Sequence, residues 1–134
     1  MTPWRQTCET APVTVCADEV LLRIPARPEY GRIVRVGATA LGIRQGLSFA
    51  EIDDLRLAID EALILLLSAA PDEAEVWAVF RFDDGRLELE LACTESAALA
   101  DDAIERFATA TDALIDDYYV EPSRNRLRLR KTPA

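Results

Sequence analysis

The most regular apolar pattern in the chain lies between residues 52 and 68. Apolar side chains recur there at the three- and four-residue intervals of an amphipathic helix, so one stripe is expected to face the core. Ser48 and Glu51 form a capping-box pair before this pattern, and Pro71 prevents its continuation, which together predict a helix over 49–70. The expected core stripe consists of Ile52, Leu55, Ile59, Ala62, Leu63 and Leu66.

Shorter patterns on either side predict the remaining elements. Alternating or β-branched runs indicate strands, and apolar residues at helical spacing indicate two further helices. We expect strands over 20–24, 75–82, 86–94 and 126–131, and helices over 29–43, 49–70 and 99–119.

The two central strands are joined at Asp84-Gly85, a strong signal for a two-residue hairpin turn. If Asp83 pairs with Arg86, the apolar side chains of both strands fall on one face, and Cys93 becomes a core residue. The opposite face then pairs Arg81 with Glu88 and Val79 with Glu90, and we expect it to be solvated or to face a partner. The arginines of 126–131 are expected to pair with Glu88 and Glu90.

These elements predict an α+β fold, a two-layer sandwich of order βααββαβ with helices on one face of a mixed sheet. A single domain over 18–134 accounts for the whole pattern, preceded by an extended or loosely ordered lead-in over 1–17. The lead-in contains Cys8 and Cys16, either a regulatory thiol pair or two unrelated reduced cysteines.

Composition excludes several classes of function. The 134 residues carry a net charge of -9, which repels nucleic acid, and no apolar run is long enough for a signal peptide or a membrane span. We therefore expect a cytoplasmic protein with no nucleic-acid or membrane partner. Histidine is absent and the three cysteines have no metal-ligand spacing, so histidine-based catalysis is excluded and no metal site is expected.

Glu61 is the one acidic residue that the helical pattern places among leucines, beside Leu57, Ile64 and Leu65. A carboxylate in such surroundings is costly unless it is paired, hydrogen-bonded or protonated. Two interpretations of Glu61 stay open: a helix-face carboxylate whose tip reaches solvent, and a carboxylate that takes part in the protein's function.

The segments LRIPARPEY and DLRLAIDEA, with Arg35 on the helix between them, resemble the GHKL ATPase superfamily, and specifically the RsbW-type anti-sigma serine kinases. The resemblance implies the Bergerat, or histidine kinase-like ATPase, fold. In catalytic members of that family the glutamate of the DEA triplet, here Glu61, is followed four residues later by an asparagine, and the pair holds magnesium and the attacking group. Leu65 occupies the second position and offers no oxygen ligand.

The family's second nucleotide motif, D-x-G-x-G, also has no counterpart here. The corresponding stretch is ACTESAALADD, which contains no glycine and has Cys93 or Thr94 where the aspartate that reads adenine would stand. Without glycine the backbone cannot easily approach a phosphate. The resemblance therefore implies a relic Glu61 and no cofactor; ATP and Mg²⁺ would bind only if the chain were an active kinase.

Partners are also implied by the resemblance. An arginine that contacts the sigma factor in the family corresponds to Arg35, and Arg32 and Val36 lie beside it, so these three residues are the expected partner-binding set. The default alternative is an ordinary solvated helix face. The implied partners are an alternative sigma factor, a competing anti-anti-sigma protein of the STAS type, and a second copy in a homodimer.

The leading functional hypothesis is thus an anti-sigma-factor-like regulator that sequesters a sigma factor without ATP. One alternative is an active ATP-dependent anti-sigma serine kinase that phosphorylates an anti-anti-sigma protein, with Glu61 as catalytic base. The other is a structural or small-ligand-binding module whose former nucleotide cavity is lined by Leu57, Ile64 and Leu65.

Overall fold

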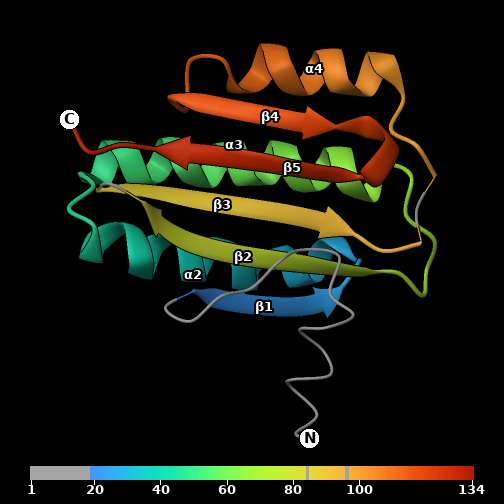
Figure 1. Ribbon diagram of the computed structural model, residues 1–134, viewed down its shortest axis with the longest axis horizontal. Coiled ribbons are helices and arrows are strands. Elements are labelled where there is room, and N and C mark those ends of the chain that lie inside the picture. The colour runs from blue at the N-terminus through green and yellow to red at the C-terminus, as the bar shows by residue number, and fades with distance from the viewer. Residues whose placement is uncertain (1–18, 84, 96) are drawn as a thin grey trace, which may run out of the picture.

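A computed structural model describes residues 19–83, 85–95 and 97–134 (Figure 1). The expectations for the lead-in over 1–17, including Cys8 and Cys16, lie outside the described residues. A five-stranded sheet of order β1-β2-β3-β5-β4 is backed by a layer of helices. The strands are β1 (Val20–Pro25), β2 (Glu75–Asp83), β3 (Arg86–Cys93), β4 (Asp117–Glu121) and β5 (Arg126–Lys131). The helices are η1 (Pro28–Tyr30), α2 (Gly31–Arg44), α3 (Phe49–Leu67), α4 (Asp101–Thr111) and η2 (Pro122–Arg124).

The α+β two-layer prediction is confirmed, but the sheet is antiparallel throughout and not mixed. The single-helix connection from β3 through α4 does bring β4 back parallel to β3. However, the chain then turns at η2 and inserts β5 between them, so β3 and β4 never pair. The expected order βααββαβ therefore lacks one strand.

That strand is β4, which lies in the segment predicted from the sequence to be the end of a helix over 99–119. The helix α4 ends at Thr111, and the chain re-enters the sheet at Asp117. Two tyrosines and a valine in this segment favour a strand, and opposite charges face each other across the pair at Asp117–Arg130 and Glu121–Arg126. Pairing also satisfies the backbone of β5, which would otherwise be an open edge.

The predicted hairpin register is confirmed in every pair. One face of the sheet carries Val76, Ala78 and Phe80 of β2, all fully buried beneath the helices. α3 supplies most of the helical side of this core and lies centrally in the layer, between α2 and α4 (Figure 1). Cys93 is 4% exposed and belongs to the same core, as expected.

The opposite face of the sheet was expected to be solvated or to face a partner, and its centre is not solvated. Trp77 and Val79 are 4% and 0% exposed, and Glu88 and Glu90 are buried too. The predicted cross-strand ion pairs explain how these carboxylates are tolerated: Arg126 lies 3.3 Å from Glu90, and arginines of β5 flank Glu88 at 3.7 and 3.9 Å. Buried carboxylates of this kind need such partners.

No helix in the described part of the chain is long and apolar enough to cross a membrane.

Candidate functional site

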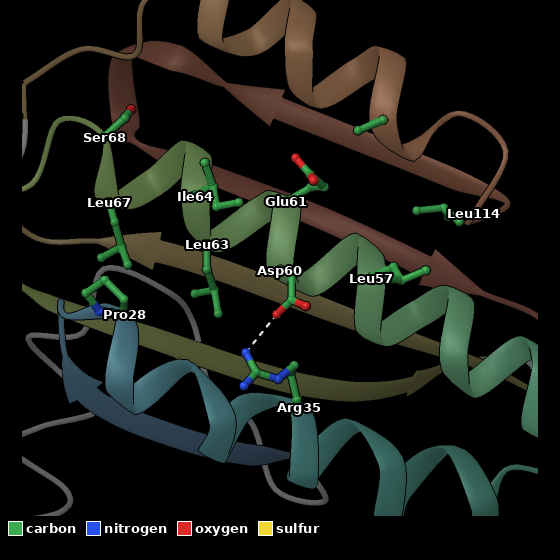
Figure 2. Close-up of a pocket in the computed structure, with 11 residues that line it drawn as sticks. Pro28, Arg35, Leu57, Asp60, Glu61, Leu63, Ile64, Leu67, Ser68 and Leu114 are labelled. Atoms are coloured by element: carbon green, nitrogen blue, oxygen red, sulfur yellow. Dashed lines mark hydrogen bonds and ion pairs between the residues drawn. The ribbon is translucent and has the colours of Figure 1, made fainter.

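Helix α3 positions the two acidic residues of the site. Ser48 caps its first turn: the Ser48 side chain accepts a hydrogen bond from the Glu51 amide at 3.2 Å, and Glu51 accepts one from the Ser48 amide at 2.8 Å. Asp60 and Glu61 follow two and a half turns later. Because neighbouring side chains on a helix diverge by about 100°, Asp60 points toward α2 and Glu61 toward α4 (Figure 2).

An open groove of about 960 Å³ runs along the outer surface of α3. α3 forms its floor, the start of the α2 region lies on one side, and the end of α4 with the turn after it lies on the other (Figure 2). Most of the lining is apolar; the charged members are Arg35, Asp60 and Glu61. The apolar members are Pro28, Leu57, Leu63, Ile64, Leu67, Ala110 and Leu114.

Arg35 joins the two helices on the α2 side of this groove. Its Nη1 donates a hydrogen bond to Asp60 Oδ1 at 2.7 Å, and its side chain is 29% exposed. Arg35 is therefore not an ordinary solvated helix-face residue, because the Asp60 carboxylate of α3 holds its guanidinium against the helix layer. The other two expected partner-binding residues do face solvent: Arg32 is exposed, and Val36 is 62% exposed.

Glu61 is less enclosed than the sequence suggested. Leu57 and Ile64 are 53% and 46% exposed, so they form groove surface and not a closed apolar shell around the carboxylate. Glu61 itself is half-buried. Hydrophobic periodicity implied burial against protein, but this side of α3 faces an open groove. The half-buried Glu61 fits the interpretation of a helix-face carboxylate whose tip reaches solvent.

Leu65, the residue at the family's asparagine position, is 2% exposed. Glu61 and Leu65 together border a second, much smaller cavity of about 20 Å³, closed on the α4 side by Arg106 and Phe107. A space of this size is close to the minimum for a single water molecule. Helix α4 therefore packs directly over Glu61 and Leu65.

The stretch that replaces D-x-G-x-G is tied to the sheet. Thr94 accepts a hydrogen bond from the Glu75 amide through its hydroxyl at 2.9 Å, and its own amide donates to the Glu75 carbonyl at 2.9 Å. Glu95 takes a left-handed conformation, with φ of 53°, that glycine adopts more readily. Further along, the Leu99 amide donates to the Pro122 carbonyl at 3.3 Å, so this connection is anchored at both ends.

Asp60 is the site residue that the sequence reading missed. It was visible only as part of the DEA triplet, and nothing in a periodic pattern links it to Arg35, which lies 25 residues earlier. Ala110 and Leu114 were missed too, and Leu114 lies in the segment 112–116, which was assigned to a helix but follows the end of α4. Among the described residues, no group of three histidine, cysteine or acidic side chains lies close enough to hold a metal ion.

Known proteins similar to this chain were found among curated sequences and solved structures, but not among family models. No family model matches the chain. The chain is 31% identical over 77 residues to the serine-protein kinase RsbW of Bacillus thuringiensis (strain Al Hakam), a match covering 56% of this chain and 48% of that protein. It is 28% identical over 78 residues to the serine-protein kinase RsbW of Listeria monocytogenes serotype 4a (strain HCC23), covering 56% and 50%. The matches thus span about half the length of these curated relatives.

Among solved structures, the chain is similar to the RsbU and RsbW domains of Rv1364c from Mycobacterium tuberculosis, with a TM-score of 0.62 and 15% identity. That alignment covers 90% of this chain and 33% of the other, and at this identity it speaks for the fold alone. The resemblance inferred from LRIPARPEY and DLRLAIDEA is therefore confirmed: the chain is similar in sequence to RsbW serine-protein kinases and has an RsbW-like fold of the GHKL type.

Proposed function

We propose that the protein is an anti-sigma-factor-like regulator that binds and sequesters an alternative sigma factor without using ATP. The observation that carries this proposal is the similarity to RsbW kinases, combined with a nucleotide site whose metal and adenine positions hold Leu65 and Cys93 or Thr94. Binding would then be the activity that the fold retains.

The surface across α2 and α3 suits a protein partner. Val36 and Leu57 are large, apolar and more than half exposed, and they lie on the same two helices as the Arg35–Asp60 pair. A hollow of about 330 Å³ adjoins the groove here, lined by Arg35, Leu57 and Asp60 together with Asp53 and Arg56. Exposed apolar side chains around a partly buried arginine are a common composition for a protein interface.

Three contacts that a bound nucleotide needs have no suitable residue here, which supports the loss of ATP use. Leu65 offers no oxygen to magnesium, which requires hard ligands. No glycine lies between Cys93 and Asp101 to let the backbone approach a phosphate. Arg35, the only cation among the groove-lining residues, is already engaged by Asp60. The protein would therefore bind its partner without a cofactor, and Glu61 would be a relic of the catalytic glutamate.

Three further features belong to this proposal and rest on the similarity to RsbW kinases. An anti-anti-sigma protein of the STAS type would compete for the regulator. A second copy of the chain would form a homodimer. The location would be cytoplasmic, because sigma factors act there.

The test is capture of purified sigma factors of the source organism by the immobilised full chain, with Arg35→Ala as the diagnostic variant. Loss of an interface arginine typically costs roughly 2 kcal/mol, or about a thirtyfold loss of affinity. Arg124→Ala is the matched control, since the Arg124 side chain is 68% exposed on η2 and its one ion pair among the described residues is a long 3.8 Å contact with Glu121. Equal capture by all three proteins, or no capture of any sigma factor, would contradict the proposal.

An active serine kinase is the second candidate, because the relatives at about 30% identity are named serine-protein kinases and Glu61 borders the groove. Calorimetry with millimolar ATP and magnesium separates the two candidates. The sequestering regulator gives no saturable heat and phosphorylates no serine of an anti-anti-sigma protein. Micromolar ATP binding would instead support the kinase.

A further inference from the structure

The groove on α3 combines an apolar floor with an uncompensated negative charge. Leu57 and Ile64 line it and are each about half exposed, and its volume of about 960 Å³ is at the upper end of the range for small-molecule sites. Covering these side chains would remove apolar surface from water, which favours binding. The groove therefore suits a ligand with an apolar body.

The charge balance within the groove indicates what head group such a ligand would carry. Of the charged residues that line it, Arg35 and Asp60 neutralise each other at 2.7 Å. Glu61 remains: in the part of the chain that the structure describes, its carboxylate has no hydrogen bond and no ion pair. The formal charge of the lining is thus one positive and two negative groups, or −1.

The nearest candidate to neutralise Glu61 from outside the groove is Arg106, which borders the small cavity on the α4 side. No ion pair within 4.0 Å links the two side chains, and Arg106 is exposed. Arg106 is also absent from the lining of the main groove. A ligand in the groove would therefore meet the Glu61 carboxylate on a wall that lacks a free cation.

We propose that the groove binds an amphiphilic organic cation, with its apolar body on Leu57 and Ile64 and a protonated amine donating to Glu61. An anion would face two carboxylates and a guanidinium already held by Asp60. A carboxylate beside apolar surface attracts a cation more strongly than one in open water, because screening is weaker there. This proposal does not rest on sigma-factor capture, although Leu57 lines both the groove and the proposed partner surface.

The test uses octylammonium as the probe and octanoate as the anion with a similar apolar body, each titrated calorimetrically into the full chain at low ionic strength. Octylammonium should bind saturably and at least about tenfold more tightly than octanoate. Glu61→Gln should weaken octylammonium about tenfold, since it removes one charge at the site. Leu57→Ser changes a half-exposed position and should not compromise folding. It should weaken the binding of both octylammonium and octanoate.

The net charge of -9 attracts any cation, so a matched control is required. Glu105→Gln makes the same chemical change on the exposed surface of α4, outside the groove lining, and should change octylammonium affinity less than twofold. Three results would overturn the proposal: no saturable octylammonium binding, equal effects of Glu61→Gln and Glu105→Gln, or octanoate or magnesium-ATP binding as tightly as octylammonium.

Discussion

Arg35 Nη1 lies 2.7 Å from Asp60 Oδ1, and this hydrogen-bonded ion pair connects α2 to α3 across the outer helix surface (Figure 2). The sequence left two interpretations of Arg35 open, a partner-binding residue or part of an ordinary solvated helix face. Its guanidinium is held in one orientation before any partner arrives. A partner that binds Arg35 must either accept the pair as a unit or compete with Asp60 for the guanidinium.

The first prediction concerns the stability of this pair. Arg35→Ala should lower the free energy of unfolding by up to about 1 kcal/mol, because the two side chains are 29% and 42% exposed and solvent screens them. Asp60→Asn should have an effect of similar size. Urea titration of both single variants and the double variant should give a coupling energy between about 0.2 and 1 kcal/mol.

Arg124→Ala, which breaks only a long contact on the surface, should leave the urea midpoint unchanged. If the losses in unfolding free energy caused by Arg35→Ala and Asp60→Asn were simply additive, the ion pair would contribute no coupling energy. Arg35 would then not be held in a fixed orientation by Asp60.

The second prediction concerns Leu65. Leu65→Asn restores the family residue in name, but it places an amide at a position that is 2% exposed, beside a cavity of only about 20 Å³. A buried amide without partners costs about 1–3 kcal/mol. We therefore expect lower stability by urea titration and no ATP binding by calorimetry.

Leu57→Asn is the control for that experiment, since Leu57 is 53% exposed on the same helix and should tolerate the amide with a much smaller loss. ATP binding by Leu65→Asn at unchanged stability would mean that α4 does not seal the metal position.

The third prediction compares two helical glycines of α2. A Cβ at Gly37 would lie 3.5 Å from Leu22 and Phe80, an ordinary contact, so Gly37→Ala should stabilise the protein by roughly 0.5–1 kcal/mol through helix propensity. A Cβ at Gly42 would lie 3.1 Å from Leu47 and 3.3 Å from Ile52, both buried. Gly42→Ala should therefore gain less than Gly37→Ala or destabilise the protein, and thermal unfolding of the two variants gives the order directly.

Local rules predicted the parts of the fold that local chemistry decides. The capping box at Ser48 set the start of α3, and the hairpin register followed from the alternation of Phe80 and Phe82 against Leu87 and Leu89. Those features depend on residues a few positions apart or on strands joined by one short turn.

The features that were missed depend on the packing of distant segments. β4 forms because β5 offers an edge to pair with, which no helical pattern over 99–119 reveals. The half-burial of Arg35 depends on Asp60, and the exposure of Leu57 and Ile64 depends on how far α2 and α4 lie apart. Apolar spacing indicates that a side chain prefers burial, but it does not indicate whether a neighbouring element is close enough to bury it.

The last prediction concerns acid. Hydrogen bonding from the Ser48 amide lowers the pKa of the Glu51 carboxyl, with a further contribution from the Ala134 amide, which donates to Glu51 at 2.9 Å. A folded-state pKa below the ordinary value of 4.5 means that the ionised group adds stability above that value and loses it as the pH falls through the folded pKa. Glu51→Gln should therefore be less stable than wild type at pH 7, and the difference should narrow below pH 4.5.

Glu105→Gln is the control for acid unfolding, because its exposed carboxylate has no hydrogen-bond or ion-pair partner among the described residues. Urea midpoints measured from pH 7 down to about pH 3 compare the three proteins across the range in which glutamate titrates. A gap between wild type and Glu51→Gln that stayed constant over this range would assign the loss to packing or to the amide's weaker hydrogen bonds, and the ionised cap would then have no separate role. A gap that closes with acid would assign the extra stability to the ionised Glu51 carboxylate at the start of α3.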